Sequence, residues 1–188
     1  MNSHFNLIAP IYDHLIRFTR LETLLRILAL PHPGRLLDAG GGTGRVTKAL
    51  RPYVGDVIVA DVSRGMLAQA KRKQLTAVLA ASEHLPFPNQ AFDRVLMVDA
   101  LHHVVHQEQT ALELYRVLKP GGRLVIEEPD LNTLPVKAIA LLEKLMLMRS
   151  RFLPPERVAR LFPCEAQVTL ERQEYIAWII VEKGPPQS

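Results

Sequence analysis

The sequence predicts an α/β fold in which a mostly parallel sheet ends in an antiparallel hairpin. Short apolar runs alternate with helix-length amphipathic segments through most of the chain, a pattern typical of parallel βαβ units with helices on both faces of the sheet. Near the C-terminus two apolar runs follow each other without a helix between them, so they must pair antiparallel. The 188 residues suffice for one domain with a full hydrophobic core.

The positions of these runs predict the elements in order. Leucines at helical spacing predict a first helix, which Pro31 to Gly34 end. Parallel strands are expected at 35–39, 57–60, 77–80, 94–98 and 123–126, with helices at 43–53, 65–74 and 108–118. A long amphipathic helix from 136 to about 151 and a short helix at 155–161 then precede the hairpin strands 166–172 and 175–182.

Composition and charge narrow the class of protein. Hydrophobic residues are 48% and charged residues 22%, values typical of globular proteins. The net charge is +4, but only Lys71-Arg72-Lys73 form a tight basic cluster, so nucleic acid is not the expected partner. The single cysteine, Cys164, excludes an internal disulfide and a CxxC zinc site. The N-terminus does not read as a signal peptide and no segment reads as a membrane span, so we expect a cytoplasmic protein.

A glycine-rich loop joins the first strand to the first helix. Its sequence, Asp38-Ala39-Gly40-Gly41-Gly42-Thr43-Gly44, permits positive φ and lets a ligand approach the backbone. In an open α/β sheet, the crevice at the carboxyl ends of the strands is the expected ligand site. Asp61 ends the second strand roughly 20 residues later, a spacing at which a carboxylate can bind ribose hydroxyls. Loop and carboxylate together indicate an adenosine-containing cofactor.

The glycine spacing bears on which cofactor this is. The dinucleotide pattern G-x-G-x-x-G would need a glycine at Arg45 or at Thr47, and neither residue is glycine. The loop instead reads D-x-G-x-G-x-G. An NAD-dependent oxidoreductase is therefore the weaker alternative.

Four segments, in order, resemble the motifs of class I S-adenosylmethionine-dependent methyltransferases. LLDAGGGTG resembles the first motif, and VIVADVSRGMLAQAK is similar to the second. ASEHLPFPNQAFDRVLMVDALHHV and LKPGGRLVIEEP are similar to the later ones. The match is best with the broad type 11 group, which includes the ubiquinone and menaquinone biosynthesis C-methyltransferases, and it covers residues 5 to 129.

The resemblance implies a fold and a cofactor. The family has a Rossmann-like three-layer sandwich with sheet order 3-2-1-4-5-7-6 and strand 7 antiparallel, in agreement with the hairpin expected here. The cofactor would be S-adenosyl-L-methionine. We expect one methyltransferase domain over 1–188, with a helical cap at 1–31, a cofactor-binding core at 35–129, and substrate-side helices with the hairpin at 130–183.

The resemblance also implies the cofactor's contacts. Residues expected to border the cofactor are Tyr12, Asp38, Gly40, Gly42, Thr43, Gly44, Asp61, Val62, Met66, Ser82, Glu83 and Asp99. Asp38 would accept from the cofactor's ammonium, although an aspartate here can also stabilise the turn. Asp61 would bind the ribose and Met66 the adenine, although a methionine here can equally be core. Many relatives carry an aspartate at the position of Ala81, so either Glu83 or a water replaces it at the adenine edge, or the affinity for the cofactor is lower.

His102 and His103 are the candidate catalytic residues. They follow the fourth strand, where the family's transferring methyl group lies, and a neutral imidazole can act as a base. Because successive residues leaving a strand point in different directions, one of them can face the site while the other packs inside. Apart from this pair, the histidines are not spaced as metal ligands, so no metal is expected.

The acceptor is expected to be a small molecule, more apolar or aromatic than charged. The N/D-P-P-Y motif of amino-methylating nucleic-acid enzymes is absent, because Asp99-Ala100-Leu101-His102 stands there. The Leu- and Met-rich segment 135–148 is either core or an apolar wall for that substrate. A non-catalytic cofactor-binding partner or sensor remains an alternative, since fold does not determine function. The sequence leaves open the acceptor and the oligomeric state.

Overall fold

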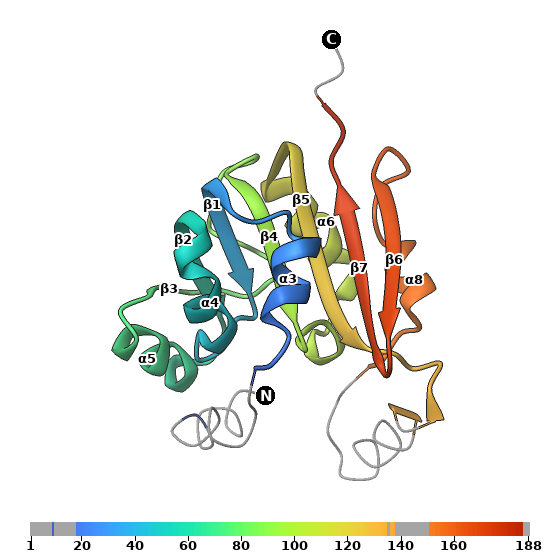
Figure 1. The fold of residues 1–188 in the computed structure, drawn as a ribbon, viewed down its shortest axis with the longest axis horizontal. Helices are drawn as coiled ribbons and strands as arrows, with labels where there is room; N and C mark the ends of the chain where they lie inside the picture. The colour runs from blue at the N-terminus through green and yellow to red at the C-terminus, as the bar shows by residue number, and fades with distance from the viewer. Residues whose placement is uncertain (1–8, 10–17, 135, 138–150, 186–188) are drawn as a thin grey trace.

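One sheet of seven strands forms the centre of the molecule, in the order β3-β2-β1-β4-β5-β7-β6 (Figure 1). The computed structural model describes residues 9, 18–134, 136–137 and 151–185. From β3 to β5 neighbouring strands are parallel, whereas β7 is antiparallel to both β5 and β6. The predicted fold class, including the strand order and the antiparallel seventh strand, is confirmed.

Four strands, β1, β2, β4 and β5, are longer than their apolar runs predict. Their bounds are β1 His32–Ala39, β2 Val54–Asp61, β3 Thr76–Leu79, β4 Phe92–Val98, β5 Leu118–Pro129, β6 Gln167–Gln173 and β7 Ile176–Glu182. The first half of β1 and the start of β2 carry exposed residues, and only their later residues are buried. An apolar run reports the buried half of a strand, so the expected starts at 35 and 57 were late by three residues.

Helices cover both faces of the sheet. Their bounds are α3 Leu21–Ile27, α4 Arg45–Leu50, η1 Arg51–Tyr53, α5 Arg64–Arg72, η2 Leu101–His103, α6 Gln107–Val117 and α8 Pro155–Ala159. The expected helix 43–53 is divided, because Pro52 cannot donate a helical hydrogen bond and a 3₁₀ turn replaces the last turn. The expected long helix from 136 to about 151 lies almost wholly outside the described residues.

Two apolar cores, one on each face of the sheet, lie between the sheet and the helices. Leu36 on β1 packs in a cluster with Leu24 of α3, while its neighbour Leu37 packs in a cluster with Leu114 of α6. This alternation follows from the period of a strand, in which successive side chains point to opposite faces. Among the residues that the structure describes, no helix has the length and apolar character needed to cross a membrane.

Candidate functional site

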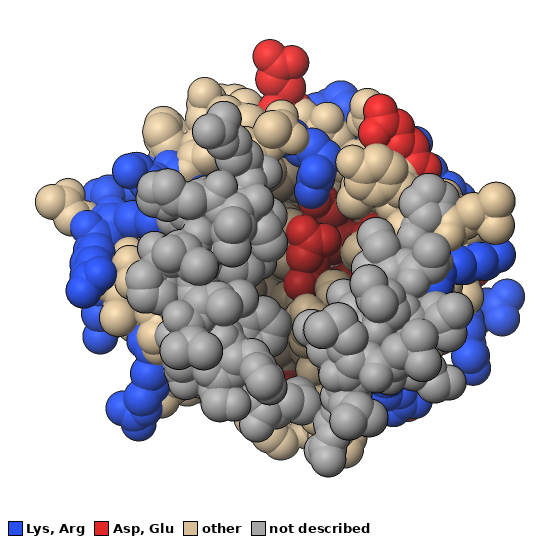
Figure 2. Space-filling view, turned by 90° about the horizontal axis from the view of Figure 1, so that it is seen from below, with Lys and Arg blue, Asp and Glu red and all other residues tan. Residues whose placement is uncertain are grey.

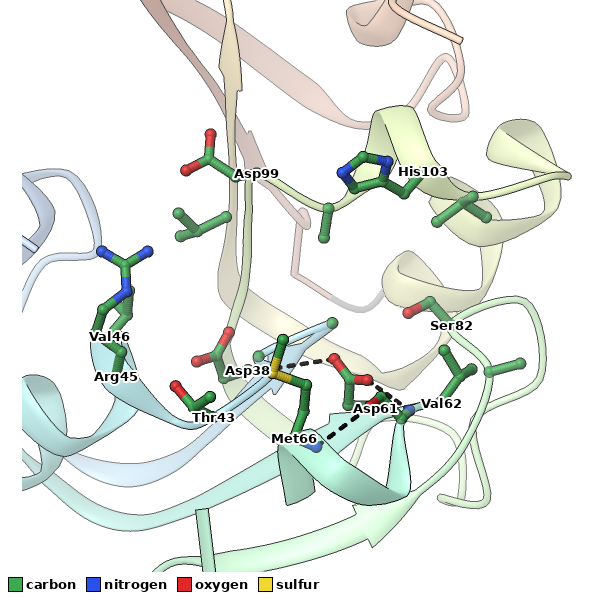
Figure 3. A pocket seen from close by; sticks show the side chains of 18 of the residues that line it. Asp38, Thr43, Arg45, Val46, Asp61, Val62, Met66, Ser82, Asp99 and His103 are labelled. Atoms are coloured by element: carbon green, nitrogen blue, oxygen red, sulfur yellow. Dashed lines mark hydrogen bonds between the residues drawn. The ribbon is translucent and has the colours of Figure 1, made fainter. Parts of the chain in front are cut away.

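A cavity of about 260 Å³ lies at the carboxyl ends of β1, β2 and β4 (Figure 3). Figure 2 shows the molecule from below the view of Figure 1, which is the side toward which the β1 arrow points. In this view Asp and Glu side chains lie in a hollow near the centre. The cavity is lined by Asp38, Gly40, Gly41, Gly42, Thr43, Arg45, Val46, Asp61, Val62, Ser63, Met66, Ala81, Ser82, Glu83, Val98, Asp99, Ala100, His103, Val104 and Val105.

The glycine loop forms the floor of this cavity with its backbone. Gly40 and Gly42 have φ of 69° and 56°, a left-handed conformation that costs other residues energy. A Cβ on Gly40 would lie 2.7 Å from the Cβ of Ala100, so the loop and the turn after β4 are in close contact. Gly44 is different, because a Cβ there would meet Leu75 at 2.4 Å, and this glycine serves the packing of α4 rather than the cavity wall.

The Asp61 carboxylate is held by backbone donors. The Gly42 N–H donates to Oδ2 at 2.9 Å, and the Ser63 N–H donates to Oδ1 at 2.7 Å. Burial raises the pKa of Asp61 above its usual value, although these hydrogen bonds oppose the rise. Met66 lies at the same end of the cavity as Asp61 (Figure 3). Each carboxylate oxygen can still accept from a ligand hydroxyl.

Asp38 is buried with one oxygen unsatisfied. The Thr47 hydroxyl donates to Oδ2, whereas Oδ1 has no hydrogen-bond partner among the described residues. Burial raises the pKa of Asp38 to about 7, and the nearby Asp61 carboxylate adds to this rise. Burying a carboxylate oxygen without a hydrogen-bond donor costs free energy. The geometry therefore favours a ligand that brings a cation or a donor to Oδ1.

The turn after β4 separates the two histidines. His103 lines the cavity, and burial together with His102 lowers its pKa to about 4, so its imidazole is neutral at pH 7. His102 is buried behind it, with Nδ1 2.5 Å from Oε2 of Glu128. Its ring stacks on Phe152 at 4.4 Å with an interplanar angle of 12°. Only His103 is therefore placed to touch a molecule in the cavity.

Asp99 lies at the same end of the cavity as His103, away from Asp61 and Met66 (Figure 3). Its φ of 49° is left-handed, a conformation uncommon for residues other than glycine. Burial, together with the Glu127 and Glu128 carboxylates, raises the pKa of Asp99 to about 6. Perturbed ionisable groups that gather in a cavity are a mark of functional sites.

The structure brings most of the predicted site residues into one cavity. Those that line it are Asp38, Gly40, Gly42, Thr43, Asp61, Val62, Met66, Ser82, Glu83, Asp99 and His103. Gly44 and His102 lie behind its wall, and Tyr12 lies outside the described residues. Ala81, where many relatives carry an aspartate, also lines the cavity, together with Ser82 and Glu83.

Sequence reasoning missed Arg45 and Glu128. Arg45 follows the glycine loop directly and lines the cavity, so its place after the loop was a usable signal. Glu128 is absent from the wall but binds the turn that carries His103. Within the described part of the chain, no group of three or more His, Cys, Asp or Glu side chains is arranged to hold a metal ion.

Comparison with known proteins finds similar sequences for about half of the chain. Residues 37–126 match the family described as "Methyltransferase domain". The chain is 39% identical over 117 residues to the ubiquinone/menaquinone biosynthesis C-methyltransferase UbiE of Coxiella burnetii (strain Dugway 5J108-111), a match covering 56% of this chain and 47% of that protein. It is 39% identical over 108 residues to the UbiE protein of Stutzerimonas stutzeri (strain A1501), covering 52% and 42%. The chain thus spans about half the length of the curated relatives it matches.

Solved structures share the whole fold. A SAM-dependent methyltransferase from Thermotoga maritima aligns with a TM-score of 0.81 at 22% identity, covering 97% of this chain and 100% of that one. A SAM-dependent methyltransferase from Aquifex aeolicus aligns with a TM-score of 0.68 at 20% identity, covering 96% and 97%. At these identities the likeness extends to the fold.

Proposed function

We propose that this chain is a class I S-adenosylmethionine-dependent methyltransferase, which transfers a methyl group from that cofactor to a small apolar or aromatic molecule. The observation that carries the proposal is the unsatisfied Oδ1 of the buried Asp38 beside the glycine backbone. The cofactor's ammonium would supply the missing donor and stabilise the ionised carboxylate, whose pKa is raised to about 7 without it. The match of residues 37–126 to the methyltransferase family and this fit both support the same ligand.

The residues of the cavity fit the rest of the cofactor. The backbone at Gly40 and Gly42 approaches without side chains, as a bound amino-acid moiety requires. Asp61 is held by two backbone donors and would accept from the ribose hydroxyls. Met66 would cover the adenine, and Ser82 and Glu83 would lie at its edge.

When bound, the cofactor supplies a sulfonium-linked methyl group, which an electron-rich acceptor atom can displace in line. The protein then has to align the acceptor and exclude water. His103 and Asp99 lie at the end of the cavity away from Asp61, where we place the acceptor. The neutral His103 imidazole can accept a hydrogen bond from an acceptor hydroxyl or N–H. We assign the base role, where the acceptor needs one, to His103 rather than His102.

The apolar character of the acceptor is supported by the wall at this end. Val98, Ala100, Val104 and Val105 line it without adding a charge. The relatives named for ubiquinone and menaquinone biosynthesis suggest quinone-related aromatic acceptors. A phenol or quinol is therefore the first class of acceptor to examine.

The proposal is tested by calorimetric titration of S-adenosylhomocysteine and NADH into the purified chain. We expect saturable binding of S-adenosylhomocysteine and much weaker binding of NADH. Mass spectrometry of phenol, quinol and amine acceptors incubated with cofactor and protein then tests transfer. Binding of NADH without binding of S-adenosylhomocysteine would refute the assignment, and cofactor binding without transfer to any acceptor would favour a non-catalytic role.

A further inference from the structure

The turn after β4 is anchored on the neighbouring strand by a side chain. In the parallel pairing of β4 with β5, Val98 is aligned with Glu127, and the Asp99 N–H donates to the Glu127 carbonyl at 2.9 Å. Beyond this point the acceptor is a side-chain carboxylate and no longer a backbone carbonyl of β5. The next two N–H groups, of Ala100 and Leu101, donate to Oε1 of Glu128 at 3.1 and 2.8 Å. Glu128 therefore takes the place of a strand carbonyl beyond the end of the ladder.

The other oxygen of Glu128 binds the same turn further along. Oε2 lies 2.5 Å from Nδ1 of His102, and both residues are 5% exposed. The His102 ring stacks on Phe152, and the His102 carbonyl accepts from the Arg151 N–H at 2.7 Å. One buried carboxylate thus links β5, the turn after β4 and the segment that leads to α8.

This turn carries the wall at the acceptor end of the cavity. Ala100, His103 and Val104 line the cavity, and Ala100 also contacts the glycine loop at Gly40. A turn that has lost its anchor would shift all of these groups together. Glu128 itself does not line the cavity, so it can act only through the turn.

We propose that Glu128 is a positioning residue, which holds the turn from Ala100 to His102 so that His103 faces the acceptor. The naming of this end as the acceptor end rests on the proposed function. The anchoring of the turn does not, because it follows from the contacts alone. The buried carboxylate is satisfied by two N–H groups and an imidazole, so its removal leaves those donors without an acceptor.

Glu127 offers a matched control. It is the adjacent residue of the same strand and is also fully buried, but its side chain lies on the opposite face. There it accepts from Trp178 Nε1 at 2.8 Å and pairs with Arg20, and among the described residues its carboxylate accepts no hydrogen bond from the Ala100 or Leu101 N–H group. Replacing Glu127 with glutamine therefore removes a buried charge next to Glu128 in β5 and leaves the hydrogen bonds of Glu128 in place.

The test compares Glu128→Ala, Glu128→Gln and Glu127→Gln in the full chain. Amide hydrogen exchange at Ala100 and Leu101 is followed by NMR without ligand, and S-adenosylhomocysteine binding is measured by calorimetry. In Glu128→Ala we expect exchange at both amides to accelerate at least about tenfold and binding to weaken about fivefold, because hydrogen bonds to a charged group are lost. Glu128→Gln keeps one acceptor oxygen and should restore both values to within about threefold of the parent. Glu127→Gln should leave the two amides unchanged within about twofold.

Unchanged exchange and binding in a folded Glu128→Ala variant would overturn the proposal. So would equal acceleration in Glu127→Gln, which would indicate general loosening. If Glu128→Ala does not fold, the test uses the parent and Glu128→Gln. The proposal is refuted if, in both proteins, the amides of Ala100 and Leu101 exchange as fast as amides in exposed loops. Failure of the parent to bind S-adenosylhomocysteine would refute the proposed function, while the exchange measurement would still judge the anchor.

Discussion

Replacing Asp38 with asparagine should stabilise the ligand-free protein against unfolding, and the gain should grow as the pH rises. Asp38 is 1% exposed, with Oδ1 unsatisfied among the described residues and Oδ2 bonded to Thr47. Its pKa rises from 3.8 to about 7 on folding, chiefly through burial. An acid whose pKa is higher in the folded state costs stability above its unfolded pKa, because the folded protein must hold the charge or keep the proton.

The size of the effect follows from these two pKa values. Below pH 3.8 the carboxyl is protonated in both states and costs nothing. Between that pH and about 7 the free energy of unfolding falls by about 1.4 kcal/mol per pH unit, which gives about 4 kcal/mol in total. From pH 5 to pH 8 the loss is about 2–3 kcal/mol. Asparagine does not titrate, so Asp38→Asn should lack this loss.

Urea unfolding at pH 5, 6.5 and 8, followed by the fluorescence of the single tryptophan, measures the effect. Trp178 is 2% exposed on the central part of β7 and reports unfolding of the core. The stability difference between variant and parent should widen by about 2–3 kcal/mol from pH 5 to pH 8. A difference independent of pH would refute the raised pKa of Asp38. The same variant should lose the stabilisation that S-adenosylhomocysteine gives the parent, since the ammonium would lose its carboxylate partner.

The remaining predictions concern the glycine loop, the ribose site and the histidine pair. Asp61→Ala should weaken S-adenosylhomocysteine binding by about 1.5–3 kcal/mol in calorimetry, because hydrogen bonds to the ribose would be lost. The far-UV circular dichroism should change little, because Asp61 lies at the end of a strand, and unchanged affinity would contradict the ribose role. His102→Ala should lower the free energy of unfolding by about 2–4 kcal/mol, since it leaves Oε2 of the buried Glu128 without its imidazole partner and opens a cavity, whereas His103→Ala should cost less than about 1 kcal/mol and act on methyl transfer. Equal losses in denaturant unfolding of those two variants would contradict their separation by the turn. Gly44→Ala should cost about 2–4 kcal/mol, because it adds a clash at 2.4 Å to a left-handed φ, and Gly121→Ala, with a similar φ and nothing within 4 Å, should cost only about 1 kcal/mol.

Sequence reasoning reached the class of fold because its determinants are local, whereas the strand order came from the family resemblance. Apolar runs mark buried strand segments, and the absence of a helix between the last two strands requires an antiparallel hairpin. The strand ends were misjudged where strands leave the core, as in the exposed first half of β1. Periodicity cannot detect a strand whose residues are solvated on both faces.

The residues of the proposed cofactor site were also accessible from the sequence. Gly40, Gly42 and Asp61 are recognised by their spacing, because the ends of adjacent parallel strands meet at one edge of the sheet. The same spacing could not separate Gly44, which packs against Leu75, from the glycines that line the cavity. That distinction depends on which atoms of a distant element lie beside each Cα.

The sequence by itself determined the class of fold, the glycine loop and the carboxylate that follows it, since each depends on neighbouring residues in the chain. Only the tertiary structure decided that His103 faces the cavity while His102 pairs with Glu128, 26 residues away in sequence. It alone showed that Oδ1 of Asp38 finds no hydrogen-bond partner within the described part of the chain. Such facts arise where separate strands end side by side, because hydrogen bonds and burial at that edge depend on the register between strands, which no local pattern of residues encodes.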